Sequence, residues 1–249
     1  MRYDRPRLPF GDVRVQLAVQ TKKRKTMIIT IDGPAGAGKS TVARMLADRL
    51  GFEFLDTGAM YRAVAWACVD RGVDLNDVND VSGTVAEISI QFEGNRIVCN
   101  GRDVTTEIRS AEASHAASIV AAVPAVRLEM VRLQRESAAD NDYVTEGRDQ
   151  GSEVFPNSGC KFFLTADLKE RAGRRLLELQ SRGQSGSMED VLAQIIDRDE
   201  RDRSRDIGPL VKADDAIEVA TSGKAIEQVV DYLERTSRER LVISTSKLA

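Results

Sequence analysis

MIITIDGPAGAGKSTVARML, residues 27–46, is the stretch of this 249-residue chain that decides its fold. A short β-branched apolar run comes first, followed by the spacing Gly33-x-x-x-x-Gly38-Lys39-Ser40 and then by a helical pattern. A strand, a glycine-rich loop and a helix in this order form a P-loop, which cradles the phosphates of a nucleotide. The sequence therefore predicts a nucleoside triphosphate site.

The residue types of this loop suit that task. The glycines let consecutive backbone N–H groups turn toward one anion, Lys39 places a positive charge at the outer phosphates, and the Ser40 hydroxyl can ligate Mg²⁺. Apolar residues recur near helical spacing from Val42 to Leu50, as expected for a helix behind the loop. The alternative, a chance match in a glycine-containing turn, does not account for these flanks.

The composition is that of a globular protein with one α/β domain, or one such domain with an insertion, since 42% of the residues are hydrophobic and 30% are charged. A net charge of −3 argues against a nucleic-acid binder that relies on a basic surface. Cys68, Cys99 and Cys160 lack the spacing of a zinc site or a disulfide framework. Because no long apolar segment or secretory signal is present, we expect a cytoplasmic protein without a membrane partner.

Residues 1–26 differ from the rest of the chain, with eight Lys or Arg against two Asp. We interpret them as a disordered basic arm that the fold does not need. A targeting or nucleic-acid role for the arm is the alternative.

Strands followed by helices recur after the first helix, which predicts a parallel sheet covered by helices on both faces. Between residues 85 and 104 the pattern indicates short antiparallel strands with turns at Gly94-Asn95 and Asn100-Gly101, and hence an inserted subdomain. The other expected strands are 52–55, 143–145, 161–165 and 216–219. The other expected helices are 60–71, 111–123, 126–137, 168–182, 188–205 and 222–236, the last capped by Ser222.

The segment DRDERDRSRD, residues 197–206, carries closely spaced charges of both signs. On a helix, three of its arginines and one carboxylate would share a face: Arg198, Arg201, Arg205 and Asp202. Like charges so placed repel one another unless a bound polyphosphate neutralises them, as happens during phosphoryl transfer. The alternative is a solvated helix with salt bridges between residues four apart.

Three further arginines, Arg171, Arg174 and Arg175, precede the Gly/Ser loop at 183–187. The two helices around this loop resemble a mobile lid that would exclude water from a triphosphate. For Arg175 alone, a surface role is the simpler interpretation.

Residues 56–62 (DTGAMYR) and the pair Arg148-Asp149 each follow a predicted strand. Both should lie at the carboxyl edge of the sheet, where ligands bind in α/β folds. The alternative for Arg148 and Asp149 is that they only pair with each other. His115, the single histidine, has no catalytic partner nearby in sequence and is not expected to act as a general base.

Together these motifs resemble those of the bacterial cytidylate kinases, a family of nucleoside monophosphate (NMP) kinases. IDGPAGAGKST, LDTGAMYR, VTEGRDQG, KFFLTA, ERAGRR and RDERDRSR occur in that family's order, over about residues 27–240. The resemblance implies a three-layer α/β P-loop NTPase fold with a parallel central sheet, an inserted NMP-binding subdomain and a short helical lid. It implies a monomer that transfers the γ-phosphoryl group of ATP to CMP or dCMP with Mg²⁺ as cofactor.

The resemblance also sets the expected domain limits and site residues. The core would be 27–57, 119–170 and 206–240, with the NMP-binding insertion at 58–118, the lid at about 171–205 and a tail at 241–249. ATP would be held by Gly33, Pro34, Ala35, Gly36, Ala37, Gly38, Lys39, Ser40 and Thr41, and the metal by Ser40. The acceptor would be bound by Thr57, Arg62, Ser118, Arg127, Arg148, Asp149, Arg198, Asp202 and Arg205. The catalytic cations would be Lys39, Arg174, Arg198, Arg201 and Arg205.

Three positions depart from the family pattern. Thr57 stands where serine is usual beside the cytosine, Gln150 replaces an apolar residue, and Glu153 stands within a usually apolar strand. Two other functions stay open at this point. One is a kinase for another small acceptor such as UMP, and the other is a P-loop regulator that binds ATP without catalysis.

Overall fold

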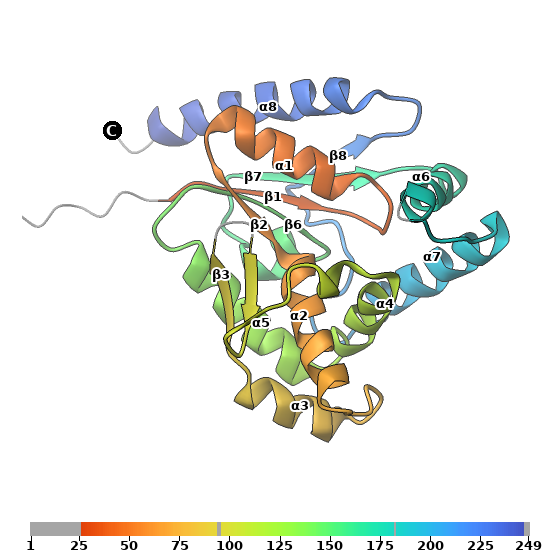
Figure 1. The fold of residues 1–249 in the computed structure, drawn as a ribbon. Coiled ribbons are helices and arrows are strands. Elements are labelled where there is room, and N and C mark those ends of the chain that lie inside the picture. The colour runs from red at the N-terminus through yellow and green to blue at the C-terminus, as the bar shows by residue number, and fades with distance from the viewer. Residues whose placement is uncertain (1–25, 94–95, 182, 247–249) are drawn as a thin grey trace, which may run out of the picture.

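The computed structural model describes residues 26–93, 96–181 and 183–246, and Figure 1 shows their arrangement. A five-stranded parallel sheet lies at the centre, in the strand order β2-β6-β1-β7-β8. Its strands are β1 (Ile28–Asp32), β2 (Glu53–Asp56), β6 (Tyr143–Gly147), β7 (Cys160–Thr165) and β8 (Ile217–Ala220). The predicted parallel sheet is confirmed.

Helices cover the sheet on both faces, which gives three layers (Figure 1). α1 (Lys39–Leu50) and α8 (Ile226–Ser246) lie on one face, and α2 (Thr57–Asp70) and α5 (Pro124–Ser137) lie on the other. Ile29 and Ile31 of β1 are fully buried against the first pair, and Thr30 between them is equally buried on the opposite face. A central strand covered on both faces needs such a nearly continuous apolar run.

The segment between β2 and β6 forms a second body with its own apolar core. Beside α2 and α5 it contains α3 (Val78–Glu87), α4 (Ala111–Val120), a 3₁₀ turn (Glu107–Arg109) and a small antiparallel sheet. The strands of that sheet are β3 (Ile90–Glu93), β4 (Arg96–Cys99) and β5 (Arg102–Asp103). The turn at Asn100-Gly101 has positive φ at both residues, as predicted for this hairpin.

α6 (Leu168–Ser181) and α7 (Met188–Arg203) stand at one end of the sheet and pack on each other. The apolar cluster between them is small and separate from the two larger cores. The pair is therefore held to the rest of the molecule largely by polar contacts, which are described below.

Several sequence predictions about element limits are wrong. Val85–Glu87 ends helix α3 instead of starting a strand; the sequence analysis missed this helix, whose first turn is capped by the Asp77 carboxylate. α7 ends at Arg203, so Arg205 lies beyond the helix. Glu153 lies in a π-helical turn (Gln150–Val154), not in a strand.

The closing helix differs at both ends from the prediction. It begins at Ile226, and Ser222 does not cap it, because the Ser222 hydroxyl accepts a hydrogen bond from the Asp167 N–H at 2.8 Å. It continues to Ser246, through most of the segment 241–249 that was expected to be a tail. The predicted arm, apart from Thr26, and the Gly94-Asn95 turn lie outside the described residues. In the part of the chain that the structure describes, no helix is long and apolar enough to cross a bilayer.

Candidate active site

The P-loop connects β1 to α1 as the sequence predicted. Gly33 has φ near 145°, and a Cβ there would lie 2.2 Å from the Leu164 carbonyl oxygen, so only glycine fits against β7. Gly36 has φ near 75° and packs against the backbone of Arg171 on α6. The P-loop and α6 are thus in direct contact.

Lys39, the first residue of α1, is almost completely buried, and its ammonium group donates a hydrogen bond to the Pro34 carbonyl at 2.8 Å. Burial, together with the positive charge of Arg148, lowers the pKa of Lys39 to about 7. The Lys39 ammonium group is therefore held inside the P-loop, where a bound anion would favour its protonated form.

Ser40 lies beside a carboxylate that the sequence analysis did not select. The Ser40 hydroxyl donates a hydrogen bond to Glu146 Oε1 at 2.8 Å. Glu146 is on β6, which pairs directly with β1, and its own backbone carbonyl accepts a bond from the Thr57 hydroxyl at 2.6 Å. The sequence feature that could have identified Glu146 as a site residue is its place at the end of a predicted strand, in VTEGRD. Only the strand order shows that Glu146 faces Ser40.

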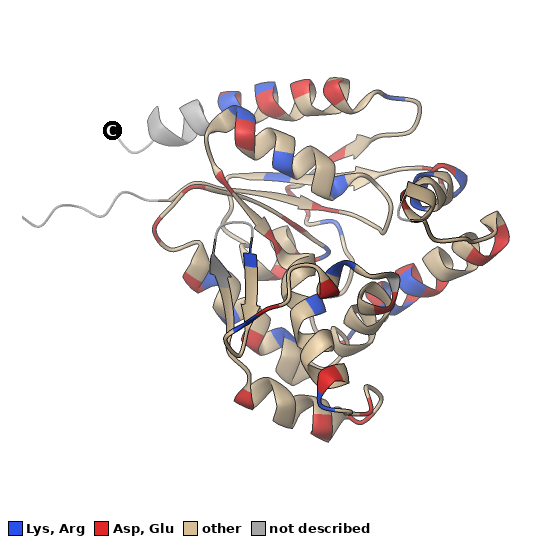
Figure 2. Ribbon diagram, viewed as in Figure 1, with Lys and Arg blue, Asp and Glu red and all other residues tan. Residues whose placement is uncertain are grey.

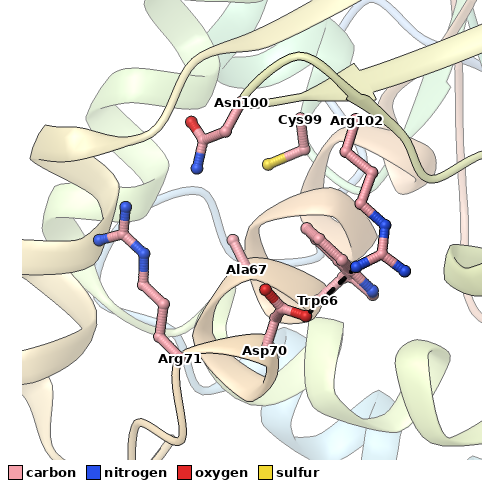
Figure 3. A pocket seen from close by; sticks show the side chains of 7 residues that line it. All are labelled: Trp66, Ala67, Asp70, Arg71, Cys99, Asn100 and Arg102. Atoms are coloured by element: carbon pink, nitrogen blue, oxygen red, sulfur yellow. Dashed lines mark ion pairs between the residues drawn. The ribbon is translucent and has the colours of Figure 1, made fainter.

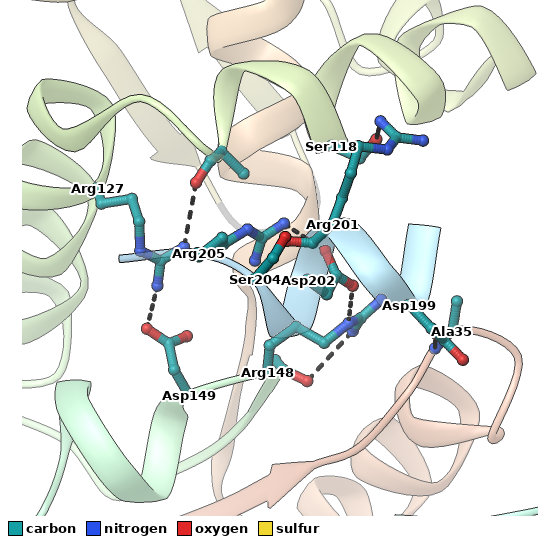
Figure 4. A network of polar contacts seen from close by, with 12 residues as sticks. Ala35, Ser118, Arg127, Arg148, Asp149, Asp199, Arg201, Asp202, Ser204 and Arg205 are labelled. Atoms are coloured by element: carbon teal, nitrogen blue, oxygen red, sulfur yellow. Dashed lines mark hydrogen bonds and ion pairs between the residues drawn. The ribbon is translucent and has the colours of Figure 1, made fainter. Parts of the chain in front are cut away.

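The arginines and carboxylates of the predicted acceptor site meet at the carboxyl end of β6 (Figure 4). Arg148 Nε donates to Asp202 Oδ2 at 2.7 Å, and Arg205 pairs with the other oxygen of the same carboxylate. Burial alone would raise the pKa of Asp202, but Arg148, Arg205 and Arg198 outweigh it and hold that pKa at about 2. Asp202 is thus a buried anion that pairs with two guanidinium groups, those of Arg148 and Arg205.

A second ion pair, between Arg127 and Asp149, lies next to this cluster (Figure 4). Both side chains are buried, and the Arg127 guanidinium also lies 5.7 Å from the centre of the Tyr61 ring. The alternative interpretation, in which Arg148 and Asp149 pair only with each other, is wrong, because each pairs with a residue from another element.

Arg198 and Arg201 both lie on α7, where basic and acidic residues alternate (Figure 2), but they differ in their hydrogen-bond contacts. Arg201 donates to the Ser118 hydroxyl at 2.5 Å and to Asp197 at 2.6 Å. Arg198 makes no hydrogen bond to any residue that the structure describes, and burial together with Arg148 lowers its pKa to about 10. One salt bridge between residues four apart, which the alternative interpretation of this segment expected, is present between Asp197 and Arg201.

Two further predicted site residues, Arg174 and Arg62, have polar partners outside this cluster. Arg174 is bound to Thr221 and Glu170 near Gly38 of the P-loop. Arg62 contacts Asp56 on its own helix end at 3.5 Å. Arg174 therefore lies beside the P-loop, and Arg62 lies near the start of α2.

Two buried side chains join α6 and α7 to the P-loop. Asp199 of α7 accepts the Ala35 N–H at 3.2 Å, and Arg171 of α6 donates to the Ala35 carbonyl at 3.0 Å. Arg171 and Asp199 also pair with each other at 2.5 Å. The sequence analysis named Arg171 only as a lid arginine and did not select Asp199.

A separate hollow of about 200 Å³ lies in the insertion (Figure 3). Arg102 lies 5.0 Å from the Trp66 ring centre, and its charge is matched by Asp70 at 3.6 Å and by Glu107 at 3.3 Å. None of the lining residues belongs to the predicted site, and this cation is already neutralised. The P-loop and the arginine cluster therefore remain the candidate active site.

Comparison with known proteins shows which family the chain resembles. The family model for cytidylate kinase matches residues 29–239. Cytidylate kinases of Geobacter sulfurreducens and Clostridioides difficile are 43% and 44% identical, over 87% and 82% of this chain and 95% of each relative. A bifunctional pantoate ligase/cytidylate kinase of Trichodesmium erythraeum is 48% identical over 90% of this chain, which spans only 43% of that protein. The chain belongs to the cytidylate kinase family.

Proposed function

We propose that this chain transfers the γ-phosphoryl group of ATP to CMP or dCMP, which yields ADP and CDP or dCDP. The observation that carries this proposal is the position of two anion sites at the ends of neighbouring strands. The P-loop follows β1, the arginine cluster begins at the end of β6, and the two strands are paired. A donor phosphate on the loop would face an acceptor phosphate among the arginines.

The donor would be held by Gly33 through Thr41, with Lys39 at its outer phosphates. In direct transfer an acceptor phosphate oxygen forms a bond to the γ-phosphorus while the bond to the ADP leaving oxygen breaks. Such a reaction needs positioning and charge neutralisation more than a nucleophilic side chain. We assign that neutralisation to Lys39, Arg174, Arg198, Arg201 and Arg205.

Ser40 and Glu146 fit a Mg²⁺ ion. Within the described residues no three histidines, cysteines or carboxylates form a metal cluster. Mg²⁺ at nucleotide sites does not require one, because it uses one or two protein oxygens together with phosphates and water. The Ser40 hydroxyl and the Glu146 carboxylate, 2.8 Å apart, supply those oxygens. When bound, the ion would be held by Ser40 and Glu146 and would neutralise negative charge on the phosphates during transfer.

The acceptor base would be recognised by the pair Arg127 and Asp149 with Arg205. Cytosine offers an exocyclic amino donor and ring acceptors, which suit a carboxylate and a guanidinium. Uracil would place an acceptor against the carboxylate, and a mismatch of this kind at a buried polar site is strongly unfavourable. We assign acceptor contacts also to Thr57, Arg62, Ser118, Arg148, Arg198 and Asp202.

The same proposal divides the chain by role. The core would be 27–57, 119–170 and 206–240, the insertion at 58–118 would bind the acceptor, and 171–205 would be the lid. The separate apolar cluster between α6 and α7 supports a lid that moves as a unit.

An acceptor panel tests the proposed function. The purified chain is incubated with ATP, Mg²⁺ and one of CMP, dCMP, UMP, AMP or GMP, and ADP release and the diphosphate product are both measured. We expect CDP and dCDP to form, with kcat/KM for UMP lower by about a hundredfold or more. Equal rates for UMP would favour a broader kinase, and slow ATP hydrolysis without a diphosphate product would favour a regulator.

A further inference from the structure

We propose that Asp32, which stands in the motif IDGPAGAGKST but is not among the site residues above, is a positioning residue for the acceptor. Its carboxylate holds the backbone that follows Asp149 and thereby fixes where Arg148 and Asp149 point. This role rests on the proposed function, because it concerns how the acceptor site is held in place.

The contacts of Asp32 carry this inference. Asp32 is the last residue of β1 and is only 4% exposed. Its Oδ1 accepts the Gln150 N–H at 2.9 Å, and its Oδ2 accepts the Gly151 N–H at 2.8 Å. These N–H groups open the π-helical turn that directly follows Asp149. In its ionised form, a carboxylate that accepts two N–H groups at the start of a helical turn makes strong charge-assisted hydrogen bonds.

The π-helical turn is also held in place by packing and by further hydrogen bonds. A Cβ on Gly151 would lie 2.9 Å from the Thr30 hydroxyl oxygen, so the turn packs directly on β1. The Gln150 side chain accepts from the Thr145 hydroxyl at 2.7 Å and donates to Gln134 at 3.0 Å. Gln150, which departs from the family pattern, thus helps Asp32 to pin the turn.

The position of Asp32 links the two halves of the site. It directly precedes Gly33, the first residue of the P-loop, while the turn that it holds directly follows the two acceptor residues. Lys39 and Asp149 are the charged groups that act on it. Burial raises the pKa of Asp32 to about 7, and an apolar residue would be easier to bury at this position. The hydrogen bonds from Gln150 and Gly151 act in the opposite direction on this pKa, and they explain why the fold keeps a carboxyl group here.

The substitution Asp32→Asn tests this role. Asparagine has nearly the same shape, but it keeps one acceptor oxygen and turns an NH₂ donor toward a backbone N–H. We expect the KM for CMP to rise about tenfold or more, because small displacements of binding groups have large effects. The KM for ATP and kcat should stay within about threefold of the unaltered protein, since the P-loop and the transferring groups are retained.

Asp77→Asn is the matched control. The Asp77 carboxylate also accepts two backbone N–H groups, from Asn79 at 2.9 Å and Asp80 at 3.1 Å, but it caps α3 in the insertion. This variant should leave both KM values unchanged. If Asp32→Asn does not fold, Gly151→Ala pushes the same turn away from Thr30 of β1 and should raise the KM for CMP selectively.

The outcomes separate this role from the proposed function. If the unaltered chain phosphorylates no monophosphate, the proposed function fails, whatever Asp32 does. If the unaltered chain phosphorylates CMP, an Asp32→Asn variant with an unchanged KM for CMP would overturn the positioning role. Equal increases in both KM values, or a loss of kcat alone, would overturn it as well.

Discussion

Removal of either partner of the Arg171–Asp199 ion pair should destabilise the protein strongly. Arg171 is 7% exposed, Asp199 is 2% exposed, and their charged atoms lie 2.5 Å apart. Two charges at about 4 Å attract by about 4 kcal/mol at an effective dielectric constant of about 20. Loss of one partner leaves the other buried without compensation, which typically costs about 3–5 kcal/mol. Asp199→Asn also weakens the bond to the Ala35 N–H.

A double-mutant cycle measures this coupling. Urea unfolding would compare the unaltered chain with Arg171→Met, Asp199→Asn and the double variant. Each single change should lower the free energy of unfolding by about 3–5 kcal/mol. The double change should cost about 1–3 kcal/mol less than the sum, because no unpaired charge remains.

An exposed pair provides the control for this cycle. Arg132 is half exposed and pairs with Glu129 at 2.5 Å on the surface of α5. Arg132→Gln should cost only about 0.2–1 kcal/mol. Single variants of Arg171 and Asp199 that each cost less than about 1 kcal/mol, with additive effects, would refute the view that this pair holds the lid helices on the P-loop.

Four further predictions concern the site. Lys39→Ala should lower kcat by at least about a hundredfold with an unchanged circular dichroism spectrum, and near-normal turnover would contradict the P-loop assignment. Glu146→Gln should raise the Mg²⁺ concentration for half-maximal activity by about 10- to 100-fold, which a metal titration would detect; an unchanged titration would exclude Glu146 from the metal site. Asp149→Ala should raise the KM for CMP far more than that for UMP, and an equal loss for both would count against base recognition. Folding raises the pKa of Asp32 from 3.8 to about 7. Between these two pH values the folded state keeps a proton that the unfolded chain releases. The free energy of unfolding should therefore fall as the pH rises through this range. Relative to the unaltered chain, Asp32→Asn should therefore gain up to about 3 kcal/mol between pH 5 and pH 8 in urea unfolding, and a constant difference would contradict the raised pKa.

The sequence predicted the fold where a local pattern was sufficient. The P-loop, the alternation of strands and helices, and the Asn100-Gly101 turn each depend on residues close together in the chain. α3 was missed because its apolar residues are few and its cap, Asp77, lies among other turn-forming residues. Arg205 was placed on α7 because the charge pattern continues past Arg203, although the helix does not.

The sequence predicted the site residues that belong to single motifs, but it did not predict which residues from different motifs contact each other. Arg148 and Asp149 were expected at the sheet edge, but their partners, Asp202 and Arg127, come from helices far away in sequence. Glu146 meets Ser40 only because β6 lies beside β1, and strand order is not visible in one sequence. Long-range pairing is therefore where the structure adds most.

The proposed reaction requires that the chain bind two nucleotides at the same time, and calorimetry can measure this. CMP is titrated into the folded chain with Mg²⁺, once alone and once with a non-hydrolysable ATP analogue at saturation. The account predicts that CMP binds in both titrations, with the analogue leaving the stoichiometry unchanged. No CMP binding in either titration, or displacement of CMP by the analogue, would contradict it.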